Sequence, residues 1–224
     1  MKWVREDFLG DSVETAKKLI GAVLVHRSPD GITAGRIVEC EAYGGIWRGH
    51  EDDGAHAFKG LTPRTRVIFE EGGHAYLYLI YGMYTCLNVV CGHEGEGTSV
   101  LLRALEPLDG IDLMKERRHT DKMKLLASGP GRLTQAMGLN KSFYGTDLTG
   151  DTLWIESRND GPYPVKRSKR INIDYARYGK NFPWRFTLEG SPLHYKEIRK
   201  RRRHELPAFF DGRRCIPIFR PVPV

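Results

Sequence analysis

Three polar side chains interrupt otherwise apolar, β-prone stretches, and these residues are the first candidates for chemistry: Glu41, Asn88 and Arg103. A polar group left unpaired on a buried strand costs about 1–3 kcal/mol, so each must either have hydrogen-bond partners or face a cavity. Taken singly, each is more often a satisfied structural residue than a catalyst. Three tyrosines crowd the same part of the sequence: Tyr76, Tyr78 and Tyr81.

The first predicted strand pair would position Glu41. Residues 22–26 and 32–43 are β-prone and flank the turn sequence Ser28-Pro29-Asp30-Gly31, which predicts an antiparallel pair with Glu41 near its end. A capping-box-like start before this pair predicts a helix over residues 13–20.

The second predicted strand pair would carry the other two polar residues and the tyrosines. Residues 74–80 and 85–91 are apolar and β-prone, and 81–84 between them is typical of a hairpin tip. A glycine-rich turn at 92–97 leads to a third strand over 99–105. Because Asn88 and Arg103 fall on neighbouring predicted strands, one sheet would hold both.

The remaining elements complete an α+β pattern. They are a loop over 44–60, a helix start at Thr62-Pro63, helices over 107–117 and 131–137, and strands over 153–156 and 185–188. This order predicts a single compact domain with a curved antiparallel β-sheet flanked by helices and a protruding β-hairpin. We expect residues 1–195 to form that domain and 196–224 to be a basic, proline-containing tail.

Composition favours a folded protein with an acidic partner. The 224 residues are 40% hydrophobic, carry a net charge of +7 and have a pI near 9.2. No apolar run approaches the roughly 20 residues of a membrane-spanning helix, and the first residues lack a signal-peptide core. We therefore expect a soluble, non-secreted, intracellular protein that has no membrane contact and is a monomer, located in the cytoplasm or nucleoid of a prokaryote or the nucleus of a eukaryote.

Two basic stretches could contact nucleic acid. Residues 196–224 contain nine Lys or Arg against three acidic residues, and 115–141 contain seven against two. Phosphate contact, a solvated helix face and, for the tail, a disordered arm all remain open. The four cysteines, Cys40, Cys86, Cys91 and Cys215, show no spacing typical of a zinc site and are expected to be buried thiols.

Several motifs, in a fixed order, resemble the alkyladenine (3-methyladenine) DNA glycosylase family. They are Ile37-Val38-Glu39-Cys40-Glu41-Ala42-Tyr43, the run from Tyr76 to Asn88, Val100-Leu101-Leu102-Arg103-Ala104-Leu105-Glu106-Pro107, Ser128-Gly129-Pro130 with Leu133, Asn140-Lys141-Ser142-Phe143, Arg185-Phe186 and Gly190-Ser191-Pro192. The similarity extends from about Leu9 to Pro192. The resemblance implies an enzyme that removes damaged purines from double-stranded DNA in base-excision repair.

The resemblance also implies a role for each matched residue. Glu41 is similar to the general base that activates a water, which Arg103 and the backbone carbonyl of Leu188 help to hold. The pocket for the extruded base would be lined by Tyr43, His56 and Tyr78, with Asn88 as a gate that clashes with the exocyclic amine of guanine. Tyr81 would wedge into the duplex, and further DNA contacts are expected from Met83, Ser128 and Gly129.

Physical chemistry agrees with these implied roles. An enzyme must extrude a base before it can reach the glycosidic bond, so the unstacking energy of a few kcal/mol has to be offset by a plug and a stacking pocket. Alkylated purines are often cationic, and tyrosine faces attract them by about 0.5–2 kcal/mol more than normal bases. A cationic base leaves without protonation, so one carboxylate suffices. No lysine of the matched motifs occupies a nucleophile position, which favours monofunctional hydrolysis without a metal or organic cofactor.

Two other functions remain open from the sequence. The same aromatic hairpin and basic surface would suit a non-catalytic module that binds modified nucleic acid, although the presence of both Glu41 and Arg103 favours an enzyme. The loop containing Glu51, Asp52 and Asp53 between two histidines could alternatively hold the metal of a nuclease, or be a solvated acidic loop. The stretch Ser128-Gly129-Pro130-Gly131 could present amides to a phosphate or be an ordinary helix cap.

Overall fold

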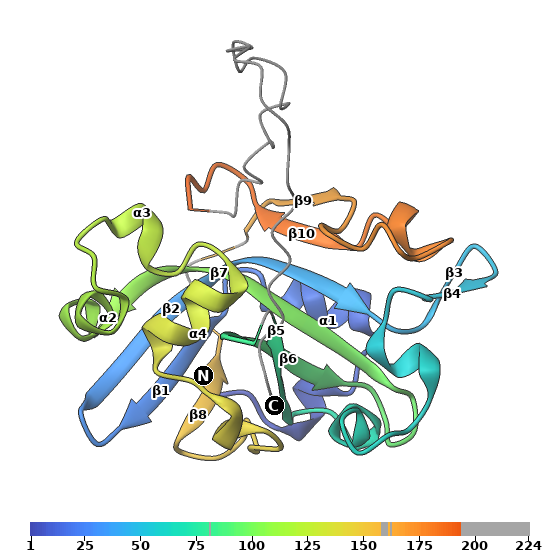
Figure 1. The fold of residues 1–224 in the computed structure, drawn as a ribbon, viewed down its shortest axis with the longest axis horizontal. Helices are drawn as coiled ribbons and strands as arrows, with labels where there is room; N and C mark the ends of the chain where they lie inside the picture. The colour runs from blue at the N-terminus through green and yellow to red at the C-terminus, as the bar shows by residue number, and fades with distance from the viewer. Residues whose placement is uncertain (81, 158–160, 162, 194–224) are drawn as a thin grey trace, which may run out of the picture.

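A large antiparallel sheet organises the molecule. The computed structural model describes residues 1–80, 82–157, 161 and 163–193 (Figure 1). The strands of the main sheet run in the order β5-β6-β7-β2-β1-β8, and β10 pairs with both β2 and β9. Their bounds are β1 Val23–Ser28, β2 Gly31–Tyr43, β5 Ala75–Ile80, β6 Tyr84–Cys91, β7 Thr98–Asp109, β8 Leu153–Glu156, β9 Val165–Ser168 and β10 Arg185–Leu188. The predicted α+β fold with an antiparallel sheet is confirmed.

Strand β2 is the centre of the sheet and carries Glu41. It pairs with β7 along most of its length, with β1 over its first half and with β10 over its second half. The pairing of β2 with β7 shifts register at three points. At one shift Glu39 faces Ala104 while Cys40 faces Leu102, so Arg103 is an extra residue in the ladder. Such a bulge bends the strand and redirects a side chain, which lets Arg103 reach the carboxylates of β2.

Strands β5 and β6 form a hairpin at the edge of the sheet, as the sequence predicts. Tyr76 pairs with Asn88, and the last pair before the tip is Ile80 with Tyr84. Met83 at the tip has 69% of its surface exposed. Tyr81, the predicted wedge, lies outside the described residues.

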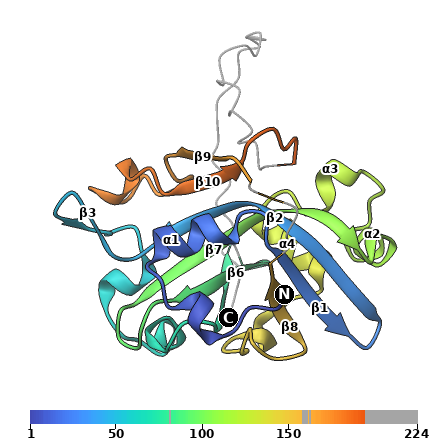
Figure 2. The same cartoon turned by 180° about the vertical axis from the view of Figure 1, so that it is seen from behind.

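Short helices cover both faces of the sheet. Helix α1 (Ser12–Leu19) lies in front in Figure 2, whereas α4 (Pro130–Met137) lies in front in Figure 1, so they pack on opposite faces. The other helices are α2 (Ile111–Arg118) and α3 (Met123–Leu126), with 3-10 turns η1 Arg5–Phe8, η2 His56–Lys59, η3 Arg66–Phe69, η4 Lys141–Phe143 and η5 Gly179–Asn181. No helix in the described part of the chain is long and apolar enough to cross a membrane.

Two predicted helix starts are wrong. Pro107 lies in β7 opposite Gly35, because pairing with β2 continues to Asp109, and α2 begins only after Gly110 in a left-handed conformation. Long-range pairing therefore overrides the local helix signal. At Thr62-Pro63 the hydroxyls of Thr62 and Thr65 hydrogen-bond to one another, and the Thr65 amide donates to the Thr62 hydroxyl. The segment is therefore a turn, and only the 3-10 turn η3 follows it.

The loop over 44–60 contains a small two-stranded sheet, β3 (Ile46–Trp47) with β4 (His50–Glu51), that was not predicted. Three cysteines, Cys40, Cys86 and Cys91, are buried free thiols as expected, whereas Cys215 lies outside the described residues. The basic tail from residue 196 also lies outside them.

Candidate active site

Glu41 is a fully buried carboxylate held by three donors. Its Oε2 accepts hydrogen bonds from the Tyr43 hydroxyl at 2.8 Å and from Nη1 of Arg103 at 3.2 Å. Its Oε1 accepts one from the backbone amide of Ile171 at 2.8 Å. A carboxylate offers about four acceptor positions, so these donors leave one free for a further partner.

Arg103 links Glu41 to a second buried carboxylate, Glu39. Its Nε donates to Glu39 at 2.9 Å, and Arg185 donates to the same Glu39 oxygen at 2.8 Å. Burial alone would lower the pKa of Arg103, but Glu41 and Glu39 raise it above its ordinary value. The arginine therefore keeps its charge inside the protein. Because Glu39 and Glu41 are two residues apart on one strand, both reach the same face of the sheet.

Three of these groups form part of the wall of a cavity of about 650 Å³: Tyr43, Arg103 and Ile171. Glu41 is not a lining residue and lies one hydrogen bond behind all three. The volume suits a small planar molecule such as a nucleobase. A ligand in the cavity would therefore contact the residues that hydrogen-bond to the Glu41 carboxylate.

Aromatic rings make up much of the rest of the cavity wall. Tyr76 and Tyr78 come from β5, and the His56 ring lies edge-on to Tyr78 with centroids 4.6 Å apart. His56 Nδ1 is 2.9 Å from the Tyr76 hydroxyl. Burial, aided by the charge of Arg64, lowers the pKa of His56 to about 4, so its ring is neutral at physiological pH. A neutral ring does not repel a cationic ligand.

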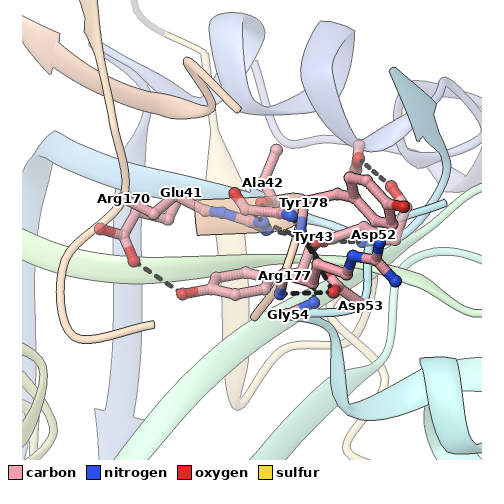
Figure 3. Close-up of polar contacts among 12 residues, drawn as sticks. Glu41, Ala42, Tyr43, Asp52, Asp53, Gly54, Arg170, Arg177 and Tyr178 are labelled. Carbon is pink, nitrogen blue, oxygen red and sulfur yellow. Dashed lines mark hydrogen bonds and ion pairs between the residues drawn. The ribbon is translucent and has the colours of Figure 1, made fainter. Parts of the chain in front are cut away.

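Tyr43 and Tyr78 both remain protonated. Burial and then the Glu41 carboxylate raise the pKa of Tyr43 well above its ordinary value. Burial and then Cys86 do the same for Tyr78. A protonated Tyr43 is the hydrogen-bond donor that Glu41 requires (Figure 3).

Asn88 lies in the cavity wall on β6, as its predicted role requires. Its side chain is buried, and Nδ2 donates to the backbone oxygen of Tyr76 at 3.3 Å. This bond ties the amide to the neighbouring strand. Asn88 therefore limits the space available to a ligand on that side.

The rim of the cavity includes two of the residues predicted to contact DNA, Ser128 and Gly129. The Gly129 amide donates to the backbone oxygen of Arg103 at 2.9 Å, and the Ser128 hydroxyl donates to Lys124 at 2.6 Å. The Gly129 amide is thus used within the protein. Two arginines, Arg118 and Arg132, also line the cavity and carry positive charge, and Arg132 donates to the backbone oxygen of Ser128 at 3.3 Å.

Leu188 does not line the cavity, unlike the other predicted pocket residues that the structure describes. It lies at the end of β10 and pairs with Val165, and its carbonyl accepts a hydrogen bond from the Ser191 amide at 3.3 Å. Strand β10 meets Glu41 through Arg185, three residues earlier. The backbone group that contacts Glu41 from the segment between β9 and β10 is the Ile171 amide, which donates to it at 2.8 Å.

The acidic loop is not simply solvated. Asp52 is buried and pairs with Arg170, which donates to both of its oxygens at 2.6 and 2.5 Å. Asp53 accepts hydrogen bonds from the backbone amides of residues 177–179, which lower its pKa against the opposing effect of burial. Across the described ranges, no three His, Cys, Asp or Glu side chains are grouped as a metal ion would require.

Four residues that hold the site together were not predicted from the sequence to do so: Glu39, Ile171, Arg170 and Arg185. Glu39 stands two residues before Glu41, so strand alternation is a signal that could have identified it. The others lie far along the chain and contribute through long-range pairing.

Comparison with known proteins identifies the family of the chain. The family model described as Methylpurine-DNA glycosylase (MPG) matches residues 6–192. A relative from Clostridium acetobutylicum is 42% identical over 200 residues, which cover 85% of this chain and 96% of its own. One from Methanoculleus marisnigri is 48% identical over 185 residues, covering 81% and 92%, and one from Bacillus cereus is 46% identical over 197, covering 82% and 94%. Each carries the name "Putative 3-methyladenine DNA glycosylase".

The match spans most of the chain and includes every described element that lines the cavity. The buried carboxylate with its arginine, and the aromatic cavity in front of it, thus lie within the matched residues. This chain belongs to the methylpurine-DNA glycosylase family and is a DNA N-glycosylase that acts in DNA repair.

Proposed function

We propose that the protein flips an alkylated or deaminated purine out of duplex DNA into the cavity and hydrolyses its N-glycosidic bond with a water that Glu41 activates. The substrate class comprises 3-methyladenine, 7-methylguanine, hypoxanthine and etheno-adenine. The observation that carries this proposal is the Glu41 carboxylate, held by three donors directly behind the wall of an aromatic cavity.

The cavity supports base flipping because it offers what an extruded purine needs. Tyrosine rings can stack on the base, and the neutral His56 adds a polar group without adding charge. A base that has left the duplex loses stacking and pairing worth a few kcal/mol, which contacts of this kind offset. Asn88 narrows the cavity and is proposed to exclude the exocyclic amine of guanine.

The proposed chemical step is hydrolysis at the sugar. The water oxygen forms a bond to C1′ while the bond from C1′ to the purine nitrogen breaks, and the departing base takes the bonding electrons. Glu41 accepts the proton that the water loses, and its negative charge stabilises the positive charge that develops on the sugar. A cationic alkylated base becomes neutral as it leaves, whereas a neutral base such as hypoxanthine leaves as an anion and takes up a proton from solvent water. The products are the free base and an abasic site.

The cavity wall supports water as the nucleophile. No lysine is among the described residues that line it. Burial raises the pKa of the Cys86 thiol to about 11, so the thiol is not a nucleophile at neutral pH. We therefore propose a monofunctional glycosylase. We further propose that it acts as a monomer and without a metal or organic cofactor.

The DNA would approach the rim of the cavity. Positive charge there comes from Arg118 and Arg132, close to Ser128 and Gly129, and the exposed Met83 marks the hairpin tip. Arginines attract the phosphates of the backbone and carry no sequence information, as an enzyme that searches for damage requires. We propose that Tyr81, two residues before Met83 in the sequence, fills the gap left by the flipped base.

A panel of duplexes that each bear one lesion tests this proposal. The protein should release the damaged base, and strand breaks should appear only after treatment with alkali, equally with and without excess chelator. Breaks that form without alkali would contradict monofunctional hydrolysis. Loss of activity in chelator would favour the metal-dependent nuclease, and binding without release would favour the non-catalytic module.

A further inference from the structure

Arg170 is a buried arginine that connects several parts of the active site without lining the cavity. It lies in the segment between β9 and η5, with its side chain fully buried. Its guanidinium donates to the backbone oxygens of Ala42 at 2.8 Å and Gly179 at 3.0 Å, and to both oxygens of Asp52 (Figure 3). Ala42 lies directly between Glu41 and Tyr43 on β2.

The same guanidinium stacks against Tyr43. Its central carbon lies 4.4 Å from the centroid of the Tyr43 ring. Tyr43 lines the cavity whereas Arg170 does not, so Arg170 supports the ring from the interior of the protein. A ring fixed in this way keeps its hydroxyl in place to donate to Glu41.

Asp52 and Ile171 extend these connections. Asp52 accepts hydrogen bonds from the amides of Gly44 at 2.9 Å and Gly54 at 3.1 Å, which fixes both ends of the loop that leads to His56. Ile171, the residue after Arg170, donates its amide to Glu41. Anchoring Arg170 therefore also anchors one of the three donors to the catalytic carboxylate.

We infer that Arg170, paired with Asp52, is a positioning residue that holds Tyr43 and Glu41 in the geometry needed for hydrolysis. The inference rests on the proposed roles of Glu41 as base and Tyr43 as pocket wall. Arginine is suited to this task because its planar group binds a carboxylate through two bonds and stacks on an aromatic ring at the same time. Lysine carries the same positive charge but lacks a planar group that could form paired bonds and stack on a ring.

Arg170→Lys tests the inference, since it keeps a cation beside Asp52 and removes the paired bonds and the stacking. The measurement is a single-turnover excision rate on a lesion duplex at saturating protein, with competent sites counted by titration with a duplex that carries a tetrahydrofuran abasic analogue. A positioning role lowers the rate constant per competent site, whereas a merely structural role lowers only the number of sites. We expect a fall in rate constant of roughly ten- to a hundredfold, the scale for a small misplacement of reacting groups.

Arg5→Lys is the matched control. Arg5 also donates to a backbone oxygen, that of Gly72 at 2.6 Å, and to a carboxylate, that of Asp147 at 2.6 Å, but it does not line or adjoin the cavity. Its rate constant per site should equal that of the wild type. Asp52→Asn is the second test variant and should lower the rate constant in the same direction as Arg170→Lys.

Three outcomes would overturn the inference. One is a rate constant within twofold of wild type in both test variants, and another is an equal fall in the Arg5→Lys control. The third is failure of both test variants to fold, which would show that the pair serves the fold and not the site. Glu41→Gln, measured in parallel, separates this inference from the proposed function: if it excises normally, the role of Glu41 is wrong, and if only it loses activity, the role of Arg170 is wrong.

Discussion

The wall of the cavity that carries Arg103 and Tyr43 differs from the tip of the β5–β6 hairpin in how its side chains are held. Behind the first wall Glu41 is fully buried, and Arg103 is 5% exposed and bonded to two carboxylates. On the hairpin, Tyr84 is 44% exposed and Met83 at the tip 69%. Groups that do chemistry must be fixed before the substrate arrives, whereas groups that contact DNA must stay accessible to it.

The comparison predicts that substitutions behind the first wall affect stability and catalysis together, while substitutions on the hairpin affect recognition alone. Substitutions behind the first wall should be costly, because the buried negative charges of Glu39 and Glu41 on β2 are each neutralised by an arginine.

Arg103→Met should have the largest effect. It leaves the buried Glu39 and Glu41 without their shared arginine, and breaking a buried ion pair costs about 3–5 kcal/mol of unfolding free energy. Excision should also fall by roughly a hundredfold or more, the scale for loss of a preorganised charged donor. Chemical denaturation and single-turnover kinetics measure the two effects. Arg66→Met, which removes an exposed arginine outside the cavity lining, is the control; equal stability of the two variants would contradict the account.

Tyr81→Ala should impair base flipping and leave stability unchanged. Stacking of a base on an aromatic ring contributes about 1–3 kcal/mol, so flipping should shift roughly ten- to a hundredfold toward the stacked state. Fluorescence of 2-aminopurine beside the lesion reports flipping, and thermal melting reports folding. Tyr178→Ala, at a tyrosine that does not line the cavity, is the control. Normal flipping combined with a large drop in melting temperature would exclude Tyr81 as the wedge.

Asn88→Ala should relax discrimination against guanine. Removing the amide makes room for the exocyclic amine, and a change of this size in a pocket alters selectivity by roughly tenfold or more. Release of guanine from undamaged and mismatched duplexes is the measurement, with hypoxanthine excision as the internal reference. If the folded variant releases guanine no faster than the wild type, Asn88 is not the gate.

His56→Gln should have the smallest effect on stability, visible only at acidic pH. The pKa of His56 is near 6.5 in the unfolded chain and about 4 in the folded protein, so the unfolded chain binds the proton more readily. The stability of the wild type should therefore fall as the pH drops from about 6.5 to 4, by about 1–2 kcal/mol after allowance for the remaining solvent exposure of the ring. The variant should lack this part of the pH dependence in denaturation curves measured across the window. If the unfolding free energy of the variant depends on pH as that of the wild type does, His56 is not the group responsible for this pH dependence.

Local sequence signals predict the strands well and single out the Glu41–Arg103 pair. The strands over 153–156 and 185–188 appear with the predicted bounds, and the 32–43 segment forms nearly the whole of β2. Glu41 and Arg103, chosen because each interrupts an apolar strand, lie within hydrogen-bond distance of one another. The cost of burying an unpaired polar group is a strong constraint, which explains why such residues can be identified from sequence.

The rest of the site depends on contacts that local patterns do not encode. Arg170 meets Asp52 across 118 positions in the chain, and Ile171 meets Glu41 across 130. Leu188, to which the water-holding carbonyl is assigned, does not line the cavity, and its place three residues beyond the partner of Glu41 depends on the register of β10 against β2, which local patterns do not encode. Pro107 was misassigned for a similar reason, since its strand is stabilised by a partner 72 residues earlier, Gly35.

Glu41 is the group proposed to activate the water, and every other proposed role in the site serves this step. The most direct test is single-turnover excision of hypoxanthine by Glu41→Gln, which keeps the size of the side chain and one of the two oxygens that accept from Tyr43, Arg103 and Ile171, but replaces the other oxygen with an amide nitrogen and removes the proton acceptor. We predict that binding of the lesion duplex is retained and that the excision rate falls roughly 10²-fold or more, as expected for loss of a general base. Excision at nearly the wild-type rate by the folded variant would contradict the account.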